Sequence, residues 1–208
     1  MADNYLERQM EDLQNRKRRC HAKPGMSLNT LLSRNRSHRG YNSSYKVSLE
    51  ELKKIIAVNA LTGCTKNQQI LRFKPLTGEE AQKFNAHIKL GGMLPELHLP
   101  LKGTEPNAFI IVCTKEQENK WTYMDLGISV QSMLLKAVSM GLNGICIGSF
   151  NKEAAKSLLP DGYEPLIVVA IGKGIEKIQL VPITEGESIA YYRKDGVHYV
   201  PKIQNLIV

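Results

Sequence analysis

The sequence predicts an α+β fold, and three observations lead to that prediction. Two continuous apolar runs, at residues 108–113 and 166–171, have the composition of buried strands. Between them, residues 124–142 are apolar around much of a helix's circumference, which predicts a buried central helix. Strands and helices intermix along the chain without the strict alternation of a doubly wound fold, so α+β is preferred.

The totals are those of an ordinary globular protein. The chain has 208 residues, of which 42% are hydrophobic and 23% are charged. We expect a charged N-terminal helix, within residues 1–26, as an extension of one domain over residues 27–208. No signal peptide and no membrane-spanning apolar run is visible, so the expected compartment is the cytoplasm.

The net charge of +8 is concentrated at one end. Residues 1–40 hold nine Lys or Arg against four Asp or Glu. Such a basic end allows a nucleic-acid-binding protein without catalysis as an alternative function. Only four Phe and one Trp are present, and they do not alternate with basic residues as base-stacking aromatics do. An anionic cofactor is therefore the preferred partner for this charge, and nucleic acid is not expected.

The cysteines predict neither a metal site nor a dithiol site. Cys20, Cys64, Cys113 and Cys146 lie more than thirty residues apart, so no CxxC pair exists. We expect all four to be reduced and most to be buried.

Sequence signals for helix starts and strands divide the N-terminal half of the chain into elements. Residues 3–19 lack Gly and Pro and predict a charged helix, which a loop-rich stretch follows. Ser48 and Glu51 have the spacing of a capping box and predict a helix to about residue 60. Residues 70–73 have the composition of a strand, and Thr77 with Glu80 predicts another capped helix.

The C-terminal half begins with a long irregular segment, residues 87–106, which is rich in Gly and Pro and typical of a binding loop. After the central helix, residues 145–147 predict a strand and residues 151–159 a short helix. The glycines at 172 and 174 do not continue into a dinucleotide-binding pattern, so we interpret them as a turn.

The basic segment, residues 34–41 (RNRSHRGY), is the first stretch with functional chemistry. Arginine has forked donors that suit phosphate oxygens, and Ser37 adds a hydroxyl donor. In extended chain, positions 37, 39 and 41 can face the same way. On these residues alone, a basic surface loop is an equally good interpretation. His38 by itself predicts only an exposed or packed histidine.

Three later stretches add polar groups. The stretch Cys64–Gln69 (CTKNQQ) offers amides that can both donate and accept hydrogen bonds. Asp125 and Gly127 open the central helix, where we expect Gln131 and the nearby methionines to pack in the core. Because Gly148 has no side chain, a flat ring can approach its backbone closely. Lys202 follows Pro201, whose ring fixes the backbone, and by itself could be a plain tail charge.

In this order, the four stretches resemble the nitroreductase family. The basic segment is similar to the family's Arg-x-Ser-x-Arg-x-aromatic motif, and Cys64–Gln69 to its Pro-Ser-x-x-Asn-x-Gln motif. The other two are similar to Asp-x-Gly-x-x-x-Gln followed by Ile-Gly-x-Phe, and to the closing Pro-Lys-Arg. Asn35 and Ile203 replace two arginines that are common in the family.

The resemblance implies a nitroreductase-like fold with a central, mostly antiparallel sheet flanked by helices. It also implies an intertwined homodimer with FMN at the subunit interface. The cofactor-binding residues that it implies are Arg36, Ser37, Arg39, Cys64, Thr65, Asn67, Gln69, Gly148, Ser149 and Lys202. The stretch at 64–69 would reach the flavin of the other subunit.

The implied function is an FMN-dependent oxidoreductase with a ping-pong mechanism. NADH or NADPH would reduce the flavin, which would then reduce a nitroaromatic, a quinone or a similar acceptor. No catalytic side chain is expected, because the hydride chemistry belongs to the flavin. An alternative keeps the flavin and the fold but carries out dehydrogenation or reductive dehalogenation, and segment 87–106 would then decide the substrate.

Overall fold

The computed structural model describes residues 25–92 and 97–207. The predicted N-terminal helix over residues 3–19 lies outside the described residues. Across the described ranges, none of the helices is long and apolar enough to cross a membrane.

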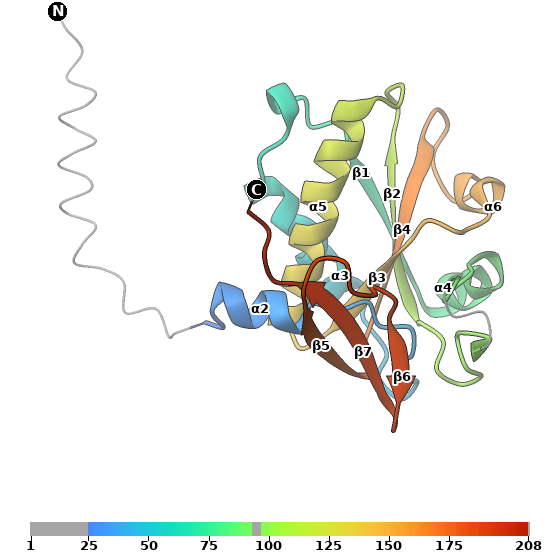
Figure 1. Cartoon of the computed structure of the whole chain (residues 1–208). Helices are drawn as coiled ribbons and strands as arrows, with labels where there is room; N and C mark the ends of the chain where they lie inside the picture. The colour runs from blue at the N-terminus through green and yellow to red at the C-terminus, as the bar shows by residue number, and fades with distance from the viewer. Residues whose placement is uncertain (1–24, 93–96, 208) are drawn as a thin grey trace, which may run out of the picture.

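A four-stranded sheet forms the centre of the molecule (Figure 1). Its order is β1-β2-β4-β3, and every neighbouring pair is antiparallel, which confirms an antiparallel sheet in an α+β fold. The strands are β1 (Arg72–Thr77), β2 (Ala108–Thr114), β3 (Asn143–Ile147) and β4 (Glu164–Gly172). The predicted strands at 108–113, 145–147 and 166–171 are thus present.

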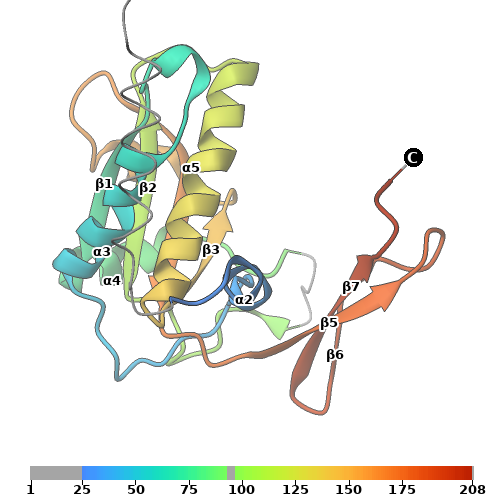
Figure 2. The same ribbon diagram turned by 90° about the vertical axis from the view of Figure 1, so that its left-hand side faces the viewer.

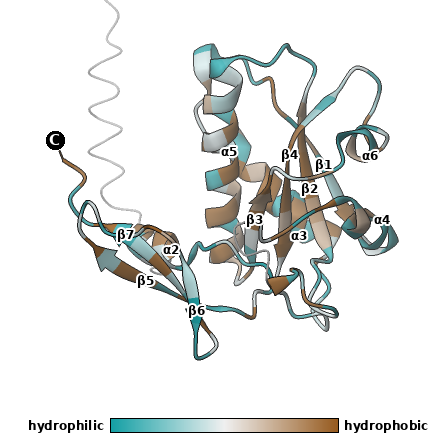
Figure 3. Ribbon diagram, turned by 45° about the vertical axis from the view of Figure 1, so that its right-hand side comes forward, coloured by the Kyte–Doolittle hydropathy of each residue, from teal (hydrophilic) through white to brown (hydrophobic). Residues whose placement is uncertain are grey.

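Helices cover both faces of this sheet (Figure 1). The helices of one face are α3 (Leu49–Ile56) and α5 (Lys120–Ser139), and those of the other face are α4 (Gly78–Phe84) and α6 (Lys152–Lys156). Figure 3 shows apolar residues where α5 faces the strands. The central helix is therefore confirmed, although it begins four residues before the predicted start, with Asn119 as its N-cap.

Strand alternation divides the core into two clusters. Ile110 and Val112 of β2 pack with α3 and α5, whereas Phe109 and Ile111 pack with α4 and α6. All four side chains are fully buried. Each such burial contributes about 1.5–3 kcal/mol, which explains why residues 108–113 lack polar positions.

Capping holds at one predicted helix start and fails at another. Ser48 and Glu51 form both hydrogen bonds of the predicted capping box at α3. The helix then tightens into a 3-10 turn over Ala57–Leu61. Thr77 precedes α4 as predicted, but its side chain makes no capping hydrogen bond.

Two local predictions were wrong at their boundaries. The stretch predicted as loop-rich contains α2 (Leu28–Arg34), whose N-cap is Ser27 and which buries no residue, so it carries no periodic apolar signal. The strand predicted at 70–73 is β1 at Arg72–Thr77, which includes Pro75. A proline is tolerated there because β1 lies at an edge of the sheet.

A second, three-stranded sheet follows β4 and was not predicted. It has the order β5-β7-β6, with β5 parallel and β6 antiparallel to β7. Its strands are β5 (Lys177–Ile183), β6 (Tyr192–Lys194) and β7 (Val197–Ile203). Figure 2 shows this C-terminal sheet standing apart from the central sheet, beside α2. Asp195 and Gly196, both with positive φ, form the tight turn between β6 and β7.

The two glycines interpreted as a turn serve close packing instead. Gly172 ends β4 against the ring of Tyr41, where a Cβ would lie 3.0 Å from the tyrosine Cγ. Gly174 pairs with Tyr41 in an isolated bridge. The basic segment therefore lies against the end of β4. Within segment 87–106, the described residues form no named strand, and a 3-10 turn, Asn85–His87, reaches into its start.

Candidate functional site

The basic segment runs alongside β3. Ser37 forms a parallel bridge with Gly144, and the His38 amide donates to the Gly144 carbonyl at 3.3 Å. A Cβ on Gly144 would lie 2.6 Å from the Ala170 carbonyl oxygen, so glycine is required for the close packing of β3 against β4.

The side chains of the segment divide between the core and an open pocket. Tyr41 is buried, and its hydroxyl donates to the His38 carbonyl at 2.8 Å. Ser37 and Arg39 face the pocket instead. The expectation that positions 37, 39 and 41 could share one direction is therefore wrong for Tyr41, because its ring fills the space that Gly172 leaves.

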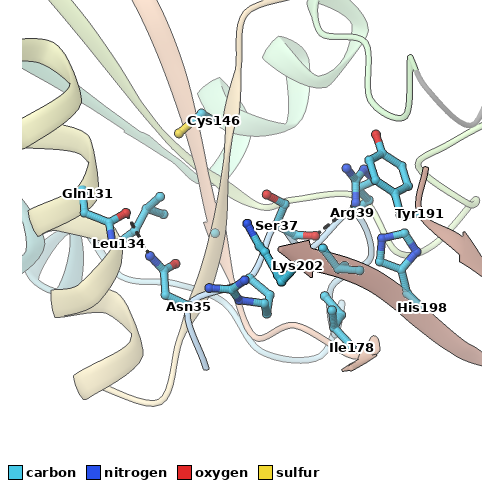
Figure 4. Close-up of a pocket in the computed structure, with 13 residues that line it drawn as sticks. Asn35, Ser37, Arg39, Gln131, Leu134, Cys146, Ile178, Tyr191, His198 and Lys202 are labelled. Atoms are coloured by element: carbon cyan, nitrogen blue, oxygen red, sulfur yellow. Dashed lines mark hydrogen bonds between the residues drawn. The ribbon is translucent and has the colours of Figure 1, made fainter. Parts of the chain in front are cut away.

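The basic pocket is a cavity of about 340 Å³ between the basic segment, α5, β3 and the C-terminal sheet. Four predicted site residues, Arg36, Ser37, Arg39 and Lys202, line it together. Figure 4 shows Lys202 reaching from β7 into the same space as Ser37 and Arg39. The full lining is Asn35, Arg36, Ser37, Arg39, Gln131, Leu134, Gly144, Cys146, Ile178, Tyr191, His198, Val200 and Lys202.

The arginines of the pocket have donors to spare. Arg36 uses one terminal nitrogen to donate to the Leu32 carbonyl at 2.8 Å, while its Nε is buried without a partner among the described residues. Burial lowers the pKa of Arg36, but an arginine remains charged in proteins. Arg39 donates to the Ser37 carbonyl at 3.2 Å and lies 5.5 Å from the centre of the Tyr191 ring. An unpaired buried donor of Arg36, beside the two further cations Arg39 and Lys202, suits an anion.

Several residues of the pocket were missed or misassigned from the sequence. Gln131 was expected in the core, but it is exposed in the pocket and accepts a hydrogen bond from Asn35 at 3.3 Å. Tyr191 and His198 lie side by side, with ring centres 5.2 Å apart. Side chains two residues apart share a face of a strand, so β7 places His198 and Lys202 on the same face. The Asp-Gly turn before β7 is the sequence signal that could have revealed this strand.

His198 is buried, and its Nδ1 has no partner among the described residues. Its pKa is lowered, first by burial and then by Arg39 and Arg193, while Glu176 acts in the opposite direction. His38 is also buried with an unpaired Nδ1, which agrees with the expectation of a packed histidine. Burial likewise lowers the pKa of His38.

The second predicted stretch lines a different cavity. The loop pocket, of about 550 Å³, lies between the end of α3, β1 and α5 and includes Cys64, Asn67 and Gln69. Thr65 is anchored beside it, because both its amide and its hydroxyl donate to Asp125, at 2.8 and 2.9 Å. The other Asp125 oxygen is buried and has no partner among the described residues.

The backbone of the loop pocket is strained. Lys66, Asn67 and Gln69 all have φ between 51° and 53°, in the left-handed region that non-glycine residues seldom adopt. Arg72 supports the turn by donating to the Gln69 carbonyl at 2.6 Å. Strain of this kind persists where surrounding contacts enforce it, and it clusters at binding sites.

The remaining predicted residues lie beyond the end of β3. Gly148 and Ser149 are both exposed. A Cβ on Gly148 would meet nothing within 4 Å, so open space borders its backbone. Ser149 lines a third cavity with residues 86–89 and accepts a hydrogen bond from the Lys89 amide at 2.8 Å. Within one chain, the ten predicted residues are thus brought together only in part.

The three cysteines of the described ranges form no site of their own, and Cys20 lies outside those ranges. Cys64, Cys113 and Cys146 are all free thiols, and only Cys113 is buried, so the expectation that most are buried was wrong. Cys146 is exposed because the face of β3 on which it lies borders the basic pocket. In the part of the chain that the structure describes, no group of three His, Cys, Asp or Glu side chains could hold a metal ion.

Comparisons with known proteins agree with this fold. The model of the nitroreductase family matches residues 32–173. A nitroreductase family protein from Clostridium difficile 630 has 22% identity and a TM-score of 0.55, over 72% of this chain and 85% of its own. One from Streptococcus pneumoniae TIGR4 has 11% identity and a TM-score of 0.60, over 74% and 93%.

An FMN- and NADPH-dependent nitroreductase, NfnB, from Sphigopyxis sp. strain HMH was solved as a single-residue variant. It has 16% identity and a TM-score of 0.60, over 72% of this chain and 88% of its own. At such identities these structures show the fold alone. No curated protein matched the chain. Because the family model covers more than half of the sequence, the chain belongs to the nitroreductase family.

Proposed function

We propose that the protein is an FMN-dependent oxidoreductase that uses NADH or NADPH to reduce a small acceptor, such as a nitroaromatic or a quinone, by a ping-pong mechanism. The basic pocket is the observation that carries this proposal. It joins Arg36, Ser37 and Arg39 to Lys202, which comes from the opposite end of the chain. Membership of the nitroreductase family supports the same function, and FMN is named for several structural neighbours.

The basic pocket fits the phosphate of FMN. Three cations line it, and the buried Nε of Arg36 has a donor free for an oxygen. A phosphate monoester is close to dianionic at neutral pH, and charge-assisted hydrogen bonds to it are among the stronger kinds in proteins. Arg36, Arg39 and Lys202 would hold this charge, and the Ser37 hydroxyl would donate one more hydrogen bond.

The flavin ring is proposed to lie near the end of β3. The open space beside Gly148 lets a flat ring approach the backbone, where the Gly148 amide could donate to it. Ser149 would contact the ring edge or the ribityl chain. FMN, when bound, accepts a hydride from the nicotinamide and passes electrons to the acceptor. The side chains of this protein bind and orient, and none is proposed as an acid or base.

We infer a homodimer in which each FMN contacts both chains. Cys64, Asn67 and Gln69 line the loop pocket, Thr65 lies beside it on Asp125, and none of the four lines the basic pocket of the same chain. A second copy can bring its loop pocket to the flavin, and the strained backbone at Asn67 supports a binding role for that loop.

Exposed apolar residues support the same homodimer. Trp121, Met124 and Ile128 of α5 are 40%, 53% and 41% exposed, as expected for a helix that a partner covers.

The proposed organisation is one flavin-binding domain over residues 27–208 with an N-terminal extension. The proposed location is the cytoplasm, and the free thiols at Cys64, Cys113 and Cys146 suit its reducing conditions.

Reconstitution tests the function directly. The purified protein should bind FMN with quenching of flavin fluorescence, and anaerobic NADH or NADPH should then bleach the flavin absorbance. Addition of a nitroaromatic or a quinone should restore it. Failure to bind FMN would refute the proposal. If neither NADH nor NADPH bleaches the bound flavin, only the reductive half-reaction is refuted.

A further inference from the structure

Glu176 lies in the connection between β4 and β5, where it contacts both the basic segment and the C-terminal sheet. One carboxylate oxygen accepts hydrogen bonds from the backbone amides of Arg39 and Gly40, the second of these at 3.2 Å. The other oxygen forms an ion pair with Arg193 of β6. A single side chain thus connects the basic segment to the C-terminal sheet.

The Glu176 side chain is only 9% exposed, whereas that of Arg193 is 30% exposed. A buried carboxylate is costly unless donors surround it, and here two amides and one guanidinium do so. Removal of the carboxylate would leave two partly buried amides without an acceptor. Close by, the backbone also links the two parts, since the Ile175 amide donates to the Gly40 carbonyl at 3.2 Å.

This connection controls the position of Arg39. Glu176 holds its backbone, and Tyr191, just before β6, lies against its guanidinium at 5.5 Å. Both contacts come from the C-terminal side of the chain, which also supplies Lys202. Arg193 is retained by Glu176 and does not line the basic pocket. Because Arg193 pairs with the carboxylate of Glu176, the cations that line the pocket remain available for a bound anion.

We propose that Glu176 is a positioning residue for phosphate recognition. It joins the basic segment to the C-terminal sheet, so that Arg39 from the first and Lys202 from the second face the same phosphate. This inference rests on the proposed function, because the phosphate is that of FMN.

The test compares FMN with riboflavin, which has the same ring and ribityl chain but no phosphate. Both flavins are titrated into the full-length apoprotein, and fluorescence quenching gives the dissociation constants. Glu176→Ala should weaken FMN binding by about tenfold or more and change riboflavin binding by less than about twofold. A merely structural loss would weaken both flavins together.

Two further variants separate the contacts of Glu176. Glu176→Gln keeps an oxygen for the amides of Arg39 and Gly40 and should retain more FMN affinity than Glu176→Ala. Arg193→Met breaks only the ion pair and should also weaken FMN selectively, so the inference remains testable if Glu176→Ala fails to fold. Glu187→Ala is the matched control, because Glu187 accepts similar hydrogen bonds from Thr184 outside the pocket.

The opposite result is equally clear. Were Glu176 only a negative charge near the phosphate, Glu176→Ala would bind FMN more tightly, and that result would overturn the inference. Unchanged FMN binding in both Glu176→Ala and Arg193→Met would overturn it as well. A wild-type protein that binds no FMN would instead refute the proposed function itself.

Discussion

Gly174 lies so close to His38 that a Cβ on the glycine would stand 2.6 Å from the imidazole Cγ. This contact packs the basic segment closely against the chain just after β4, between the pocket-lining residues Ser37 and Arg39. The closeness makes the glycine indispensable for packing rather than for a turn.

Gly174→Ala should therefore destabilise the protein by about 1–3 kcal/mol, because the new methyl group overpacks a buried contact. Urea unfolding of the apoprotein measures the change. Gly127→Ala is the control, since Gly127 is an exposed helical residue whose Cβ would meet nothing within 4 Å. The control should be neutral or slightly stabilising. Equal stability of Gly174→Ala and wild type would contradict the packing argument.

Arg39→Ala should weaken FMN binding by about tenfold or more, because it removes a charged donor from the phosphate. Lys152→Ala, at an exposed position on α6, is a control with the same loss of charge. Fluorescence titration at two salt concentrations measures both variants. Unchanged FMN affinity in Arg39→Ala would count against the phosphate assignment.

A mixture of two defective chains should regain activity if each FMN contacts both subunits. Arg39→Ala damages the basic pocket and Asn67→Ala the loop pocket, so both homodimers should reduce nitroaromatics poorly. In a refolded equal mixture, half of the dimers are hybrid and each has one intact site, which restores about a quarter of the sites. Activity no higher than the mean of the two variants would argue against a shared site.

The apoprotein should lose stability as the pH falls below about 6.5, the ordinary pKa of histidine. Burial holds the pKa of His38 below its ordinary value, with Arg39 acting in the same direction and Glu176 against it. Below that ordinary value the unfolded chain binds a proton that the folded protein does not, so the free energy of unfolding decreases. The loss continues until the pH reaches the folded pKa.

His38→Asn should make the stability of the apoprotein less dependent on pH between 7 and 5, whatever its effect on absolute stability. Urea unfolding at a series of pH values measures the slope. If the slope is the same in both proteins, His38 does not titrate with a lowered pKa.

The central fold was open to prediction because it depends on local patterns. The apolar residues at 108–113 and 166–171 must be buried on both sides, and the Ser48–Glu51 box marks a helix start through hydrogen bonds three residues apart. Helix α2 and the C-terminal sheet were missed because their local patterns are weak. α2 buries no side chain, and β5–β7 alternate only partly between buried and exposed positions, so neither has a strong period.

By itself, the sequence determined the α+β class, the central helix and the order of the stretches that indicate a flavin. Only the tertiary structure decided which of those residues meet. It placed Lys202 beside Ser37, turned Tyr41 into the core and separated Asn67 from Arg39 within one chain. It also placed Glu176 on the backbone of Arg39. Such contacts join distant parts of the chain, and no periodicity encodes them, because they depend on how the C-terminal sheet packs against the basic segment.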